Sequence, residues 1–191
     1  MIAAGNESSP VTDAEEAALT AADFEWTALI RYGAVPQVAR FGGHGNVPDR
    51  ESSVVVETDR GTEIGTALHA DRTPGGGNAA AALTGKVLRL AEAADLAKAN
   101  QSAGEVEQQF DQWVQRAADW SLQLQIIDLE KTLDGQLIVY VLNDRGPETT
   151  RLALLAAAAG SGTIHVQPVG PDGIEQGTGG GGGCGDCGCS H

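Results

Sequence analysis

The stretch from Ser53 to Leu68, SVVVETDRGTEIGTAL, determines how the first half of the chain folds. Residues 53–58 are rich in β-branched side chains and show no helical spacing of apolar positions, which is typical of a strand. Asp59-Arg-Gly61 interrupts this pattern, and a second apolar run follows as far as Leu68. Two such runs around a short turn that contains glycine predict a β-hairpin.

Two more strand-like runs precede the hairpin, at Thr27–Tyr32 and Gln37–Phe41, and they are separated by Gly33-Ala-Val-Pro36. Proline and glycine at that position favour a turn. With the hairpin, these runs predict a small antiparallel sheet.

The second half mixes helical and strand patterns. Apolar residues recur at helical steps between Glu92 and Trp120, which predicts a long helix that restarts or kinks near Gly104. After it, the sequence predicts strands over 122–130 and 137–142, a helix over 148–159 and a strand over 163–167. The expected fold class is α+β: an N-terminal antiparallel β-hairpin sheet followed by an α-β-β-α-β layer and a flexible Gly/Cys-rich C-terminal tail.

Composition divides the chain of 191 residues into three parts. Residues 1–25 form an acidic N-terminal segment that we expect to be mobile. Residues 26–170 carry the apolar patterns of the α+β domain, and residues 171–191 form a Gly-rich tail with a cysteine cluster.

The charge of the chain limits the partners it is expected to bind. With 26 acidic and 12 basic residues, the formal net charge is −14. Phosphate backbones and anionic membranes attract surfaces rich in Lys and Arg and repel a chain with this excess of acids. Direct binding to nucleic acid or to a membrane surface is therefore disfavoured. No apolar run is long enough to span a bilayer or to act as a signal peptide, so the expected location is the cytoplasm.

All the cysteines, Cys184, Cys187 and Cys189, lie close to the C-terminal residue, His191. Closely spaced cysteines, odd in number and separated by glycine, indicate thiolate ligands or redox thiols rather than a disulfide framework. Thiolates suit zinc, copper(I) or an iron–sulfur cluster, and His191 or the terminal carboxylate is a candidate fourth ligand. The alternatives are a thiol redox switch and a disordered tail with ordinary thiols.

Several segments resemble the bacterial RicT/YaaT family, which is built on the polymerase suppressor protein C-terminal domain. The hairpin Val54-Val-Val-Glu-Thr-Asp-Arg-Gly-Thr-Glu-Ile-Gly65 carries the most specific similarity. Val87–Leu96 resembles the start of the family's long helix, 122–140 its central hairpin, and 163–170 its last strand. The similarity covers roughly residues 27–170, and the glycine-rich approach to the cysteines is also similar in kind.

The resemblance implies a cytoplasmic regulatory protein without a catalytic centre, of the kind described as stage-0 sporulation proteins. Members act in small complexes with other regulatory proteins, bind iron–sulfur clusters and steer RNA maturation by an endoribonuclease. The tail differs from the family pattern, because Asp186 stands where the family has Arg and Cys187-Gly-Cys189 replaces an adjacent cysteine pair.

Our prediction is therefore a non-catalytic regulatory or scaffold subunit that holds an iron–sulfur cluster at Cys184, Cys187, Cys189 and His191. One alternative is a zinc- or copper-binding protein with no role in RNA processing. Another is a small hydrolase or transferase that uses Asp128, Glu130 and Asp134, because strand alternation puts Asp128 and Glu130 on one face.

Overall fold

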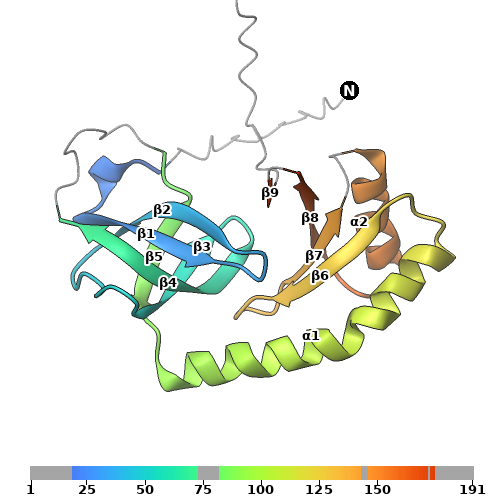
Figure 1. Cartoon of the computed structure of the whole chain (residues 1–191), viewed down its shortest axis with the longest axis horizontal. Helices are drawn as coiled ribbons and strands as arrows, with labels where there is room; N and C mark the ends of the chain where they lie inside the picture. Colours follow the sequence, from blue (N-terminus) through green and yellow to red (C-terminus); the bar gives the residue numbers. More distant parts are fainter. Residues whose placement is uncertain (1–18, 73–81, 143–145, 172, 175–191) are drawn as a thin grey trace, which may run out of the picture.

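A computed structural model of the chain describes residues 19–72, 82–142, 146–171 and 173–174. The described strands form a closed barrel and a separate four-stranded sheet, and two α-helices accompany the sheet (Figure 1). The expected mixed α+β class is thereby confirmed. The expected N-terminal segment lies mostly outside the described residues, as does nearly all of the Gly/Cys-rich tail.

The barrel follows a short 3₁₀ helix, Ala21–Asp23, and closes in the order β1-β2-β5-β3-β4. Its core is apolar and includes Ile30, Phe41, Val54 and Val56. The hairpin predicted from residues 53–68 is confirmed, since Thr58 pairs with Gly61 across the turn between β3 and β4. The strands are β1 (Trp26–Tyr32), β2 (Gln37–Gly43), β3 (Ser53–Thr58), β4 (Gly61–Asp71) and β5 (Gly85–Leu90).

The prediction for the first half was wrong in one respect, because strand β5 turns the expected sheet into a barrel. The apolar spacing predicted a helix over 92–120, and the helix begins at Ala93. The family resemblance placed the start of that helix within Val87–Leu96, but 85–90 is a strand. A short apolar run fits a strand as well as a helix when read from sequence. In the structure this run is a strand, because β5 pairs in parallel with β2 and antiparallel with β3 and so completes the barrel.

The second sheet has the order β6-β7-β8-β9. Its strands are β6 (Gln125–Lys131), β7 (Leu137–Leu142), β8 (Ile164–Gly170) and β9 (Gly173–Ile174). The β6–β7 hairpin is antiparallel, and helix α2 (Pro147–Ala158) connects β7 to the parallel strand β8. One hydrophobic cluster joins Val139 and Val141 of β7 to Trp113 of helix α1 and Leu152 of α2, so both helices share a core with this sheet.

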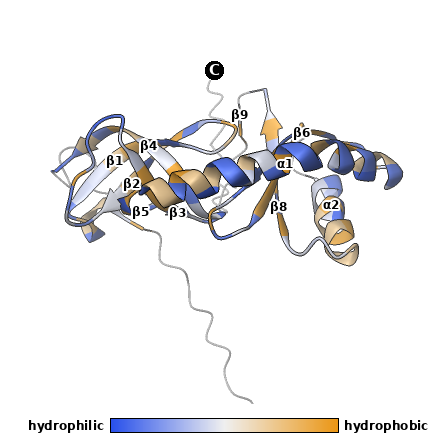
Figure 2. Cartoon of the chain, turned by 90° about the horizontal axis from the view of Figure 1, so that it is seen from below, coloured by the Kyte–Doolittle hydropathy of each residue, from blue (hydrophilic) through white to orange (hydrophobic). Residues whose placement is uncertain are grey.

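Helix α1 (Ala93–Asp119) runs beneath both the barrel and the sheet (Figures 1 and 2). Its first turn is held by Arg89, whose Nη2 lies 2.8 Å from Oδ1 of Asp95. Hydrogen bonds from Arg89 and from the Glu92 amide lower the pKa of Asp95 to about 2. The helix is not interrupted at Gly104, where the expected restart was wrong. Within the described part of the chain, no helix has the length and apolar character needed to cross a membrane.

Candidate functional site

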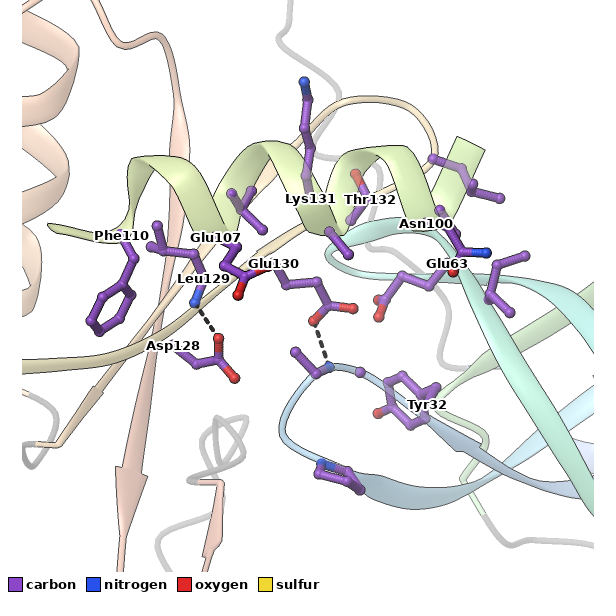
Figure 3. Close-up of a pocket in the computed structure, with 18 of the residues that line it drawn as sticks. Tyr32, Glu63, Asn100, Glu107, Phe110, Asp128, Leu129, Glu130, Lys131 and Thr132 are labelled. Carbon is purple, nitrogen blue, oxygen red and sulfur yellow. Dashed lines mark hydrogen bonds between the residues drawn. The ribbon is translucent and has the colours of Figure 1, made fainter. Parts of the chain in front are cut away.

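A cleft of about 700 Å³ lies where the barrel faces helix α1 and strand β6 (Figure 3). The β1–β2 turn forms one wall, and α1 and β6 form the other. Its lining combines apolar side chains with acids: Pro36, Ile64, Val106, Phe110, Leu129, Glu63, Glu107, Asp111, Asp128 and Glu130.

A buried polar network joins the barrel to the sheet at the end of this cleft. Arg60, in the β3–β4 turn, makes a two-point contact with Glu63, with Nη2–Oε2 and Nε–Oε1 distances of 2.5 and 3.2 Å. Its Nη1 donates to the Tyr140 hydroxyl of β7 at 2.8 Å. Tyr140 in turn donates to Oε2 of Glu130 on β6 at 2.6 Å. The chain of contacts therefore fixes the β3–β4 hairpin against the β6–β7 hairpin.

Burial and charge together set the protonation of this network. Burial raises the pKa of Glu63, while the nearby Arg60 guanidinium and the Thr58 hydroxyl act in the opposite direction. Burial opposes the charge of Arg60, but Glu63, Tyr140 and Glu130 outweigh it and raise the pKa of Arg60 further. Arg60 thus remains a cation, and its contacts compensate the loss of hydration.

Two tyrosines, Tyr32 and Tyr140, are the only ones in the chain, and both are buried beside Arg60. Burial raises the pKa of Tyr32 to about 12, although Arg60 acts against the shift from 5.2 Å above the ring. Burial, followed by the charge of Glu130, also raises the pKa of Tyr140. Neither hydroxyl is therefore suited to act as a base near neutral pH.

We predict that no phenolate absorbance develops near pH 10 in the folded protein. Because both tyrosines have a raised pKa in the folded state, their contribution to stability is complete below about pH 10, the value for a free tyrosine, and is lost as the pH rises further. Ultraviolet absorbance against pH measures this, with the guanidinium-denatured chain as the control that titrates near pH 10. A phenolate signal near pH 10 from native protein would contradict the described burial.

The acids expected as a possible catalytic set all take part in structural hydrogen bonds. Asp128 and Glu130 do point into the same space (Figure 3), as strand alternation predicted. The Leu129 amide donates to Asp128 at 2.8 Å, and the Ala34 amide of the β1–β2 turn donates to Glu130 at 3.0 Å. Asp134 lies at the β6–β7 turn, where it accepts from the Thr132 hydroxyl and packs against Gly61. The hydrogen bonds of these acids thus stabilise the β1–β2 turn, the β6–β7 turn and the β6 wall of the cleft.

The cleft nevertheless keeps a negative character. Glu107 and Asp111 are exposed on α1, and neither they nor Asp128 takes part in any ion pair among the described residues. The ammonium group of Lys131 points away from the other labelled side chains of the cleft (Figure 3), and its Nζ lies 3.0 Å from Oε2 of Glu105. Arg31, which is exposed, is the other cation of the lining. The cleft therefore favours a ligand with positive charge.

The predicted metal ligands Cys184, Cys187, Cys189 and His191 lie outside the described residues. Among the residues that the structure does describe, no three His, Cys, Asp or Glu side chains converge to hold a metal ion. The sequence pattern placed Arg60 only in the short turn of the predicted hairpin. It missed the contact with Tyr140, which lies 80 positions further along the chain.

A scan of family models, a search of curated proteins and a search of solved structures find no match to this chain. The RicT/YaaT resemblance accordingly stays a prediction, based on the quoted segments of the sequence.

Proposed function

We propose that the protein is a non-catalytic cytoplasmic regulatory or scaffold subunit, of the RicT/YaaT kind. Its α+β domain docks other regulatory proteins, and its tail cysteines bind an iron–sulfur cluster. The complex so formed acts on RNA maturation together with an endoribonuclease, while the acidic chain itself makes no direct contact with nucleic acid.

One observation carries the docking role, namely an open, acid-lined cleft between two bodies that are fixed to each other. The Arg60–Tyr140–Glu130 contacts hold the walls, so the cleft has a preformed shape. A preformed surface lowers the ordering cost of binding a partner. Its carboxylates Asp128 and Glu130 are held in structural hydrogen bonds, which supports a binding surface over a hydrolase or transferase site.

Cysteine chemistry supports the cluster. Cys184, Cys187 and Cys189 supply three thiolates on a glycine-rich backbone, and His191 or a residue of a partner completes the set. When bound, a cluster would supply redox or oxygen sensitivity to the complex.

Anaerobic purification of the full chain tests this proposal. We expect iron and sulfide in stoichiometric amounts and visible charge-transfer absorbance, both lost when Cys184, Cys187 and Cys189 are all replaced by Ser. A His191→Ser variant tests the fourth ligand alone. Zinc without visible absorbance would support the zinc-binding alternative, and metal retained in the triple variant would overturn the assignment to the tail. Circular dichroism is the control, since these substitutions lie outside the α+β domain.

A further inference from the structure

We propose that the cleft binds an extended, basic segment of a partner protein, which adds a strand to the free edge of β6. This inference rests on the proposed docking function and specifies its site and the chemistry of the partner. It depends on the backbone of β6, on the charge of the cleft and on the composition of the chain's own ends.

Strand β6 is the terminal strand of its sheet in the described part of the chain, with β7 as its neighbour on the other side. In an antiparallel edge strand, every second amide points away from the sheet. The Thr132 amide bonds the Gln136 carbonyl within the hairpin, at 3.0 Å. By alternation, the amides of Leu129, Lys131 and Leu133 point outward.

The barrel already uses one of these outward amides. The Leu133 amide donates to the Thr62 carbonyl of β4 at 2.7 Å, so the edge of β6 meets a barrel strand at that point. Leu129 and Lys131 lie further along the same edge, and both line the cleft. An extended segment lying in the cleft would continue the pairing that Thr62 begins.

Asp128 supports this assignment, because its carboxylate accepts the Leu129 amide at 2.8 Å. A side chain that accepts a hydrogen bond from an edge amide occupies a donor that would otherwise be available to pair with another strand. An incoming carbonyl would replace the carboxylate at this amide. Asp128 would then be free to pair with a Lys or Arg of the incoming segment.

The walls of the cleft select for positive charge at alternate positions of the segment. Glu107 and Asp111 are one helical turn apart on α1 and exposed, and Phe110 beside them is half-buried. A strand presents alternate side chains to opposite sides. One set of its side chains would face α1, where Glu107 and Asp111 lie, and the other would face the opposite side of β6, which carries Asp128.

Charge complementarity also argues that the occupant comes from another chain. Residues 1–18 contain four acids and no Lys or Arg, and residues 175–191 contain Glu175 and Asp186 and no Lys or Arg. Both ends would be repelled by the carboxylates of the cleft. A basic segment of a different protein fits the site, and a second copy of this acidic chain is disfavoured.

Selection from a phage-displayed library of random heptapeptides against the immobilised full chain tests the proposal. We expect enrichment of peptides with Lys or Arg at alternate positions. On adding an enriched synthetic peptide, the amide resonances of Leu129 and Lys131 should shift and their hydrogen exchange should slow. Enrichment of acidic peptides, or shifts confined to surfaces away from the cleft, would overturn the proposal, as would no enrichment.

Lys131→Pro isolates the backbone contribution, because proline is tolerated in an edge strand where the amide faces outward. We expect about tenfold weaker peptide binding from the loss of one hydrogen bond. Lys131→Ala is the matched control, since it removes the contact with Glu105 and keeps the amide. Equal affinities of the two variants would exclude strand pairing at Lys131. The resonance shifts of the unmodified protein provide the answer if Lys131→Pro does not fold.

A second pair of variants tests how much the acids of the cleft contribute to peptide binding. Glu107→Gln with Asp111→Asn should weaken binding about three- to tenfold, in line with two exposed ion pairs. Asp49→Asn with Glu51→Gln makes the same change in net charge outside the cleft, and its affinity should stay within about twofold of the unmodified chain. Equal losses in both would show that only net charge matters. Cluster content is measured separately, so loss of the cluster with intact peptide binding would overturn the tail assignment alone, and the reverse result would overturn this inference alone.

Discussion

Replacing Arg60 with Met is expected to lower the free energy of unfolding by about 3–5 kcal/mol, since removal of one partner leaves a buried charge uncompensated. The side chains of Arg60 and Glu63 are 3% and 1% exposed, so water cannot replace the lost contact. The Tyr140 hydroxyl loses a donor in the same step. Urea denaturation followed by circular dichroism measures the loss.

The pH dependence of this variant gives a second signature. Burial already raises the pKa of Glu63, and loss of the Arg60 cation raises it further. A carboxyl whose pKa is higher in the folded state binds its proton more tightly there, so its contribution to stability is present at low pH and is lost as the pH rises. The destabilisation of Arg60→Met should therefore be smaller in mildly acidic buffer than at neutral pH.

Two further variants separate the buried pair from a general effect of charge. Arg60→Met with Glu63→Met removes both ions and should recover much of the stability lost by the single change. Arg50→Met is the surface control, because Arg50 is 80% exposed beside Glu51, and it should change stability by less than about 1 kcal/mol. Similar losses for Arg50→Met and Arg60→Met would contradict the described burial.

The elements with a strong periodic pattern were predictable from sequence. The β-branched run before Asp59 predicted the first hairpin, the patterns over 122–130 and 137–142 predicted strands β6 and β7, and helical spacing predicted α1. These signals are local, because each depends on residues that are neighbours in the chain. One further feature of the sequence is consistent with the buried network. Glu63 lies on the same face of β4 as the buried Gly65 and Ala67, because it is two and four positions from them, so its carboxylate is buried as well.

The contacts between distant segments were not predictable in this way. The hydrogen bond between Arg60 and Tyr140 depends on how the barrel and the sheet meet, and no local pattern encodes that meeting. The free edge of β6 likewise becomes a cleft wall only through the placement of the β1–β2 turn. The tail cysteines carry a clear chemical signal, but they lie outside the described residues, so their role stays a prediction.

Closure of the barrel was not predicted, because the pairing of β5 with β2 also joins segments that are distant in the chain. A substitution at this closure is expected to have the second large effect on stability. Strand β5 reaches β2 through the pairs Phe41–Gly85 and Gly42–Lys86. At Gly85, a Cβ atom would lie 2.0 Å from the carbonyl oxygen of Glu57 and 3.1 Å from the Phe41 ring. A contact this short with backbone cannot be relieved by a side-chain rotation. Gly85 is therefore required where β5 passes between β2 and β3.

Gly85→Ala is accordingly expected to lower the free energy of unfolding by about 3 kcal/mol, at the upper end of the range for overpacked sites. Gly104→Ala is the matched control, because a Cβ there meets nothing within 4 Å and the residue lies inside α1. Alanine is the better helix former, so this change should raise stability by about 0.5–1 kcal/mol. The same chemical substitution should thus have opposite signs at the two sites in urea denaturation. Stability of Gly85→Ala within about 0.5 kcal/mol of the unmodified chain would mean that β5 does not close the barrel at this position.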